Sequence, residues 1–453
     1  MRILLVMAGR GQIRFEGRRI KAILPPSPLL EVAGLTSKKH HTVRIWDELA
    51  QGPVPNEMLS WANLVGISAL TTSRLGAYRV ASAARKLKKP VVAGGMDVTG
   101  HYLEGHGDEL LAHYDAIVVG RLTSRLWSEV LSDFENQHPK SVYTAESLDD
   151  EPWEFVVPRY DLVEPNNYYF PAAVRTSAGC SYGCKWCTVG LICNKVEVKP
   201  HDILKVELAS LPKTRMPLIV YDDCFGGDYD YTKEVPLPLL HSSGRRWFTE
   251  LTTRLMMGHK SGNPALLEPM VDAGLMGAYL GIENVIEQTG GKSPVDLTEE
   301  AIRAAHRFGV IVAGSLMLDA TGKETPESIS QMVDWVLSNH LDLVQLSLVA
   351  ALPGSVLRRE ALKLNLLIAQ NPELFDGAWP TIAHSILSPE EQIELLRKAY
   401  YRIYSLTAIA RRIIGHRHFW VNLLANLVVR RMSHRWWGQV GYTHWLNTRN
   451  QQN

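Results

Sequence analysis

The stretch Arg175 to Cys193, RTSAGCSYGCKWCTVGLIC, decides the fold and the chemistry that we expect of this chain. Within it, Cys180, Cys184 and Cys187 are spaced Cys-x3-Cys-x2-Cys. Three thiolates on one short loop can each ligate a different iron of a cubane 4Fe-4S cluster. No fourth cysteine follows at a standard four-thiolate spacing, so one iron stays open for a small ligand.

The residues between the thiols suit this interpretation. Gly179 and Gly183 give the loop backbone freedom to wrap a cluster, and Trp186 is expected to shield the cluster or to form a wall for an aromatic ligand. The alternatives are a zinc site or three buried structural thiols. Zinc usually takes four ligands in two separated pairs, and this chain has no second pair, so the cluster is favoured.

At these cysteines the sequence resembles the radical S-adenosylmethionine superfamily, whose defining loop has this spacing and an aromatic residue before the last cysteine. The resemblance implies that the open iron chelates the amino and carboxylate groups of S-adenosylmethionine. An electron from the cluster then cleaves the sulfonium to a 5'-deoxyadenosyl radical. It also implies a reducing electron donor such as a flavodoxin or a ferredoxin.

Length and composition indicate an ordinary globular protein of two or three domains: 453 residues, 46% hydrophobic and 21% charged. Five cysteines argue against a disulfide framework and favour the reducing cytoplasm. The N-terminal MRILLVMAGRGQ is typical of a buried strand and not of a signal peptide. No apolar run approaches the roughly 20 residues of a membrane span.

Residues 1–140 alternate apolar runs with helical patterns, which predicts an α/β domain with an open parallel sheet. The runs are Ile3 to Met7, Thr42 to Trp46, Leu64 to Leu70, Pro90 to Gly94 and Ala116 to Val119. Ligands bind such sheets at the carboxyl ends of the strands. The small and polar residues expected there are Ser68, Leu70, Thr71, Thr72, Gly94, Gly95 and Gly120. On this domain alone, a ligand-free Rossmann-like fold with ordinary turns is slightly favoured, and the lack of Gly-x-Gly-x-x-Gly disfavours a dinucleotide.

The order of LPPSPLLEVAGLT, HTVRIWDE, GISALTT, VVAGG and DAIVVGR upstream of the cysteines resembles the cobalamin-binding domain of cobalamin-dependent radical S-adenosylmethionine enzymes. The resemblance implies that the seven strand-end residues contact cobalamin. The Asp-x-His-x-x-Gly loop that supplies a histidine to cobalt in the methionine synthase type is missing. Two cases therefore stay open, binding without a lower histidine and a domain that has lost cobalamin, and we favour binding.

Residues 141–170 carry no clear period and are interpreted as a linker. From residue 171 to 385 strands and helices alternate again, which predicts a partial (β/α)6 TIM-like barrel. Its expected strands are Ala172 to Thr176, Leu218 to Asp222, Trp247 to Thr253, Gly277 to Ile282, Ile311 to Leu318 and Leu343 to Val349. Six units fit the barrel of the superfamily better than a closed barrel of eight.

Polar residues follow several of these strands, where such barrels place their active groups. VYDDCF and LGIEN resemble family segments beside the cofactor, which implies contacts from Asp222, Asp223, Gly281 and Glu283. Ser315 lies at another strand end, and Arg254 is a suitable partner for the methionine carboxylate of the cofactor. For each acid, a helix cap or a surface ion pair is an equally good explanation. Cys193 and Cys224 are expected to pack as small buried side chains.

Residues 386–453 are predicted to form a mainly helical, basic region. An apolar stretch, HFWVNLLANLVV, is flanked by arginines, and no Asp or Glu follows Glu394. Such a helix can lie in a membrane interface, or it can pack on the barrel with snorkelling arginines. The sequence leaves both open, so we expect a cytoplasmic protein with a membrane-surface contact as one option. Nucleic-acid binding is disfavoured because the basic residues form no polar stripe.

Together these features predict a cobalamin-dependent radical S-adenosylmethionine enzyme. Methyl transfer to an unactivated carbon of a small-molecule or lipid-like substrate is the commonest activity that the resemblance implies. The alternatives are a radical cyclase, dehydratase or rearrangement catalyst, with or without cobalamin. A non-catalytic iron-sulfur redox protein is a further, less favoured class, because it needs no open iron.

Overall fold

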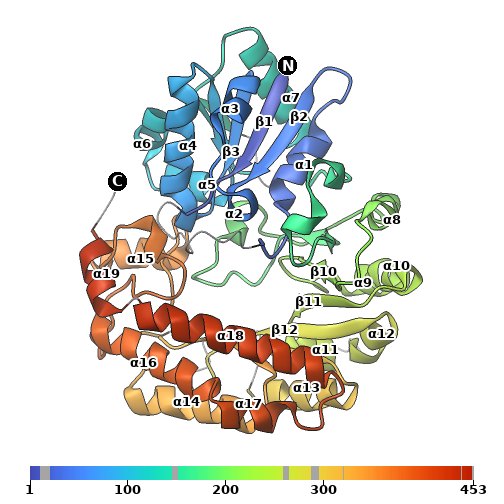
Figure 1. Ribbon diagram of the computed structural model, residues 1–453, viewed down its shortest axis with the longest axis vertical. Helices are drawn as coiled ribbons and strands as arrows, with labels where there is room; N and C mark the ends of the chain where they lie inside the picture. The colour runs from blue at the N-terminus through green and yellow to red at the C-terminus, as the bar shows by residue number, and fades with distance from the viewer. Residues whose placement is uncertain are drawn as a thin grey trace. The chain divides into compact units, whose positions relative to one another are not determined.

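The computed structural model describes residues 1–10, 21–144, 152–258, 265–286, 295–319, 321–439 and 441–450 (Figure 1). The chain divides into two compact units. The first comprises Met1–Asp223 with Leu352–Arg359, and the second comprises Cys224–Ala351 with Glu360–Gln452.

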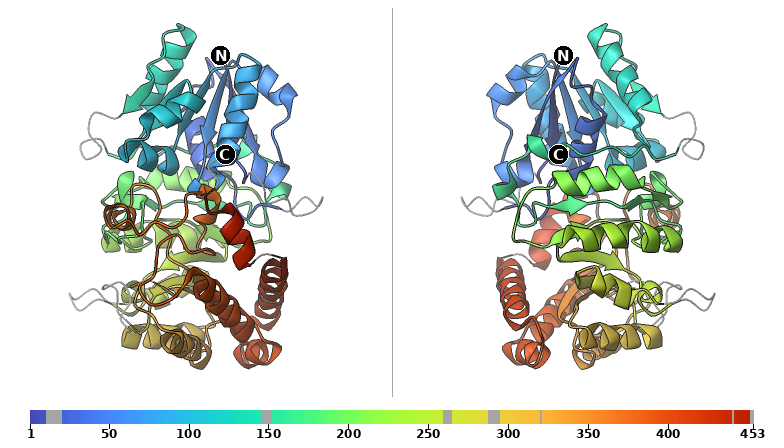
Figure 2. Two further views of the ribbon diagram at one scale, coloured as in Figure 1. Left: turned by 90° about the vertical axis from the view of Figure 1, so that its left-hand side faces the viewer. Right: turned by 90° about the vertical axis from the view of Figure 1, so that its right-hand side faces the viewer.

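The first unit begins with a six-stranded parallel sheet in the order β2-β1-β3-β4-β5-β6. Its elements are β1 (Arg2–Met7), α1 (Ser27–Leu35), β2 (Thr42–Asp47), α2 (Glu48–Gln51), α3 (Asn56–Trp61), β3 (Leu64–Ser68), α4 (Arg74–Lys86), β4 (Val91–Gly94), α5 (Met96–Leu103), α6 (Gly107–His113), β5 (Ala116–Val119), α7 (Ser124–Glu135) and β6 (Val142–Thr144). Helices cover both faces of the sheet (Figure 2). Leu4, Val65 and Ile117 are fully buried, as the apolar runs require for strands with two covered faces.

All five strands predicted for this domain are confirmed. The sixth strand, β6, was not predicted, because it has only three residues at the edge of the sheet and shows too little alternation to stand out. Beyond β6, described residues 152–172 contain two short 3-10 turns, at Tyr160–Leu162 and Pro165–Asn167, and an isolated β-bridge from Tyr168 to Ala22.

The six strands predicted after the linker are also confirmed: β7 (Ala173–Val174), β10 (Leu218–Val220), β11 (Trp247–Leu251), β12 (Leu275–Glu283), β13 (Ile311–Met317) and β14 (Leu343–Ser347). Their order is β14-β13-β12-β11-β10-β7, so the sheet has two ends and is an open, partial barrel. The helices between them are α8 (His201–Ser210), α9 (Tyr229–Glu234), α10 (Pro236–Ser243), α11 (Thr253–Met257), α12 (Leu267–Asp272), α13 (Val295–Arg307) and α14 (Pro326–Ser338), and α15 (Val356–Lys363) follows β14.

The C-terminal region is helical, as predicted. It contains α16 (Pro389–Ile403), α17 (Leu406–Ile413), α18 (Phe419–Gln439) and α19 (Tyr442–Thr448). A capping box starts α16, in which Ser388 and Glu391 satisfy each other's backbone amides. Among the described helices, none is both long enough and apolar enough to cross a bilayer.

Candidate functional site

The loop that carries the three cysteines is closed at its base by a short antiparallel pair. β8 (Ser177–Ala178) pairs with β9 (Glu197–Val198), with Ser177 opposite Val198. Cys180, Cys184 and Cys187 therefore lie on one loop of the first unit whose two ends are held together.

Two neighbouring carboxylates at the end of β10 hold this base in place. Asp222 accepts hydrogen bonds from the Thr176 amide at 2.6 Å and from the Ser177 hydroxyl at 2.8 Å. Asp223 accepts one from the Gly179 amide at 2.9 Å. Burial raises the pKa of the Asp222 carboxyl, although its hydrogen bonds oppose the rise. Both predicted cofactor contacts thus position the loop, and their direct contact with S-adenosylmethionine stays a prediction.

The backbone at Gly179 admits no side chain. Its φ is +82°, and an added Cβ would lie 2.0 Å from the Lys195 carbonyl oxygen and 2.6 Å from the Cys193 Sγ. The Cys193 thiol is buried, donates to the Lys195 carbonyl at 3.0 Å and has a pKa raised by burial. The packing role predicted for Cys193 is confirmed, whereas Cys224 is only partly buried, so the same prediction is wrong for Cys224.

The three motif cysteines differ from Cys193 in their exposure. Cys187 is exposed, Cys180 and Cys184 are half-buried, and no disulfide joins any of the five cysteines. The Cys187 amide donates to the Cys184 carbonyl at 3.0 Å, which makes a tight turn around the half-buried Trp186. Thiols on such an accessible loop can take up iron without unfolding the protein.

A cavity of about 270 Å³ lies at the carboxyl ends of the strands of the first sheet. Five of the predicted residues line it: Ser68, Leu70, Gly94, Gly95 and Gly120. Thr71 and Thr72 are not among its lining residues, because they begin a 3-10 turn at Thr71–Ser73 that leads into α4. Contacts from these two residues to cobalamin stay a prediction that the cavity does not support.

The cavity also has an aromatic and basic wall that sequence reasoning missed. The guanidinium groups of Arg121 and Arg175 each lie 5.3 Å from the centre of the Trp153 ring. Arg121 is buried and pairs with Glu197 at 3.1 Å, and the Arg175 Nε lies 4.0 Å from a Glu31 carboxylate oxygen. Arg121 and Arg175 flank motifs that the sequence analysis quoted, but nothing in the sequence indicates that both approach Trp153.

The cysteine loop and the cavity share part of their walls. Asp223 and Cys193, which hold and pack the base of the loop, both line the cavity. The two sites predicted for different cofactors are therefore neighbours within the first unit.

In the second unit, three predicted residues come together at the ends of β12 and β13. Gly281 lies opposite Ser315 in the parallel register, and the register shifts between Gly281 and Glu283. Glu283 has a φ of +65°, which is uncommon for a side-chain-bearing residue and often marks a functional site. Arg254 lies in α11, directly after β11. Their binding of S-adenosylmethionine remains a prediction.

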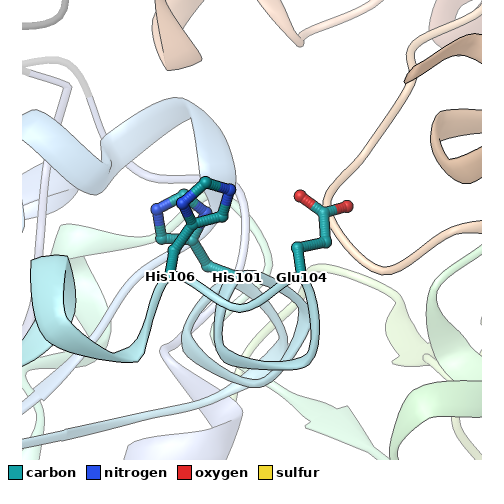
Figure 3. A group of neighbouring side chains, drawn as sticks. All are labelled: His101, Glu104 and His106. Carbon is teal, nitrogen blue, oxygen red and sulfur yellow. The ribbon is translucent and has the colours of Figure 1, made fainter. Parts of the chain in front are cut away.

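A group of potential metal ligands outside the cysteine loop lies at the end of α5 (Figure 3). His101, Glu104 and His106 bring one ligand atom each to within 4.8 Å of one another, and the two imidazole rings stack. Both Glu104 carboxylate oxygens already accept hydrogen bonds, from the Gly354 amide at 2.7 Å and from the Arg358 Nε at 2.9 Å. We interpret this group as a structural contact to Gly354 and to Arg358 in the first turn of α15.

Comparisons with known proteins agree with the interpretation of the cysteine loop and the cavity as cofactor sites. No protein-family model matches the chain. It is 21% identical over 430 residues to the bacteriochlorophyllide d C-8(2)-methyltransferase of Chlorobaculum tepidum, covering 88% of this chain and 90% of that protein. It is 22% identical over 435 residues to the C-12(1)-methyltransferase of the same organism, covering 91% and 90%. An uncharacterized methyltransferase of Pyrococcus horikoshii is 23% identical over 416 residues, covering 84% and 88%.

Among solved structures, the fold matches the cobalamin-dependent S-adenosylmethionine radical enzyme OxsB with aqua-cobalamin and S-adenosylmethionine bound. The TM-score is 0.64 at 11% identity, covering 96% of this chain and 72% of OxsB. The chain is thus similar over most of its length to proteins named as methyltransferases, and in fold to an enzyme that binds cobalamin and S-adenosylmethionine.

The residues of this chain fit a 4Fe-4S cluster at the cysteine loop and a bulky cofactor such as cobalamin at the cavity. The loop carries three thiols, and the β8–β9 pair fixes its two ends. Three thiolates are the donor set of a 4Fe-4S cluster with one open iron. At the cavity, the Arg175 Nε forms no hydrogen bond within the described residues, and its acidic neighbour Glu31 lies 4.0 Å away, so it can still donate a hydrogen bond to a polar group of a ligand. The small residues Gly94 and Gly95 leave the strand ends open for a bulky cofactor.

Proposed function

We propose that this enzyme transfers a methyl group to an unactivated carbon of a small molecule. The observation that carries the proposal is the wall shared by the cysteine loop and the strand-end cavity, formed by Asp223 and Cys193. Methyl transfer by a radical route needs both cofactors next to one substrate. The relatives named methyltransferases match this chain over 84% to 91% of its length, which supports the same reaction.

When bound, the cofactors supply hydrogen abstraction from carbon and a transferable methyl group. The chain's own residues bind and orient them. Cys180, Cys184 and Cys187 would hold the cluster on the loop that Asp223 fastens to β10. Trp153 and the two guanidinium groups beside it, whose charges Glu197 and Glu31 offset, would give the second cofactor a flat wall with hydrogen-bond donors.

Two relatives are named for bacteriochlorophyllide d, so a chlorin-type tetrapyrrole is the first substrate class to test within this proposal. A flavodoxin or ferredoxin is proposed as the electron donor. The proposal also includes work beside a membrane, since the basic C-terminal region and an apolar substrate would favour that location.

The test is anaerobic reconstitution with iron, sulfide and hydroxocobalamin, followed by metal analysis of the desalted protein. We expect about four irons and one cobalt per chain. Addition of S-adenosylmethionine, a reductant and a chlorin substrate should then yield both S-adenosylhomocysteine and 5'-deoxyadenosine with a methylated product. Iron without cobalt, and deoxyadenosine without S-adenosylhomocysteine, would instead assign the chain to radical rearrangement or dehydration. The variant with all three motif cysteines replaced by Ala is the negative control, and it should retain no iron.

A further inference from the structure

The C-terminal helix α18 exposes its apolar side chains and buries polar ones. Trp420, Leu424 and Met432 are 77%, 66% and 62% exposed, and Val421, Leu427 and Val428 are exposed as well. In contrast, Asn422, Asn426 and Ser433 are buried. A helix on the surface of a globular protein normally shows the opposite arrangement.

Buried hydrogen bonds fix the rotation of α18 about its axis. The Asn426 side-chain Nδ2 donates to the Asp342 backbone carbonyl oxygen at 2.9 Å. Arg412 donates to the Asn426 side-chain oxygen at 2.7 Å. Asn422 donates to the carboxylate of Asp342, which is fully buried. Turning the helix to hide its apolar residues would leave these buried polar groups unpaired, which is costly. The apolar exposure is therefore a consequence of the fold.

The exposed apolar residues form one continuous face. At 100° per residue, Trp420, Val421, Leu424, Leu427, Val428 and Met432 occupy an arc of about 140° on the helix. The buried residues Asn422, Asn426 and Ser433 lie within about 40° of one another on the opposite side. We call the first arc the apolar face of α18. Arg431 projects from within this arc and is exposed.

The charge around the apolar face has one sign. Arg411, Arg417 and Arg431 are exposed and form no ion pair within the described residues. No acidic residue follows Glu394 in the sequence, so α17 and α18 carry no carboxylate that could offset these cations. An apolar helix face that carries Arg431, in a segment whose charged residues after Glu394 are all basic, matches the boundary between the acyl chains and the anionic headgroups of a membrane.

We infer that the apolar face of α18 docks on the surface of an anionic lipid bilayer, with the helix lying in the plane of the interface. A second copy of the chain fits less well, because a symmetric contact through this face would bring the same arginines of both copies together. Among the described helices none, α18 included, is both long and apolar enough to cross a membrane, so we infer contact with the bilayer surface. The inference deepens the membrane part of the proposed function, but its evidence is the helix alone, so a failure of methyl transfer would leave it standing.

The experiment is co-sedimentation of the full chain with vesicles of phosphatidylcholine alone and of phosphatidylcholine mixed with phosphatidylglycerol. The wild type should bind the anionic vesicles and lose binding as salt is raised. Replacing Trp420 by Ser together with Leu424 by Gln should lower the partition coefficient about tenfold or more, because both side chains leave the acyl region. The matched control replaces Leu49 and Val206 by Gln; these are 51% and 54% exposed apolar residues of the first unit, and binding should not change.

A second variant separates charge from apolar contact. Replacing Arg411 and Arg431 by Gln should weaken binding to anionic vesicles about tenfold and leave the weak binding to neutral vesicles unchanged. Far-ultraviolet circular dichroism and the thermal midpoint verify that each variant is folded. Equal binding by wild type and the Trp420/Leu424 variant, or no binding by either, overturns the inference. Dimerisation in light scattering that only this variant abolishes, without vesicle binding, would assign the face to a second copy.

Discussion

The Oδ2 of Asp223 accepts a hydrogen bond from the backbone amide of Gly179 at 2.9 Å. Gly179 directly precedes Cys180, the first of the three motif cysteines, and Asp223 follows β10 and lines the cavity. One carboxylate thus connects the end of a barrel strand, the start of the cysteine loop and the wall of the neighbouring cavity.

Replacing Asp223 by Ala should loosen the start of the loop. A hydrogen bond to a charged group contributes about 1.5–3 kcal/mol, so we expect several-fold less iron to survive desalting after reconstitution. Asp223→Asn is the control, because its amide oxygen still accepts from Gly179 and most of the iron should remain. Equal iron in the wild type and the Ala variant would show that the bond does not position the loop.

Single replacement of Cys180, Cys184 or Cys187 by Ala should abolish the iron-sulfur absorption, since a cubane cluster needs all three thiolates here. Cys193→Ala is the matched control, because its thiol is buried and donates to the Lys195 carbonyl. It should keep its iron and lose only a little stability. Loss of iron from Cys193→Ala alone would contradict the ligand assignment.

Gly94 offers a test of the cavity that leaves the cluster untouched. A Cβ at Gly94 would meet the Val118 Cβ at 3.4 Å, an ordinary contact, so Gly94→Ala should fold and retain cobalt. Gly94→Leu should fill part of the 270 Å³ cavity and reduce the retained cobalt at least severalfold, with unchanged iron. Metal analysis of both variants measures the two effects. If the Leu variant retains full cobalt, cobalamin binds elsewhere.

The stability of the first unit should depend on Asp47. Burial raises the pKa of this carboxyl to about 6 from 3.8, against the hydrogen bond it accepts from Leu49. Because the folded-state pKa is the higher one, its contribution to the unfolding free energy is full below about pH 4 and is lost as the pH rises through 6. Asp47→Asn keeps the helix cap and cannot ionise, so relative to the wild type it should gain up to about 3 kcal/mol between pH 4 and pH 7. Urea unfolding at three pH values measures this, and parallel pH profiles would refute it.

Most of the fold could be predicted because its strands are buried on both faces and therefore appear as apolar runs. β3 and β13 are examples: β3 ends at Ser68, and Asp319 follows β13 after Leu318. Short elements escaped prediction: β6 has three residues, and the β8–β9 pair has two residues in each strand. Their pairing depends on partners that are distant in the sequence.

The cysteine motif could be identified from the sequence because its chemistry is local. The cavity wall could not, since Trp153 meets Arg121 and Arg175 only after folding, from an acidic segment interpreted as a linker. Backbone strain is equally invisible: the positive φ of Glu283 arises where the register shifts at the end of β12. The LGIEN motif identified Glu283 as a candidate, and only the structure shows the backbone conformation of Glu283.

The antiparallel pair Ser177–Ala178 with Glu197–Val198 also bears on how the cluster assembles. Bringing the ends of a flexible segment together costs conformational entropy, and that cost grows with the length of the segment. In this chain, folding of the first unit brings the two ends of the cysteine loop together, so this entropy is already lost before iron binds. The thiols then search a confined volume, so cluster assembly should be fast and reversible on a folded protein, and removal of iron should leave the unit intact.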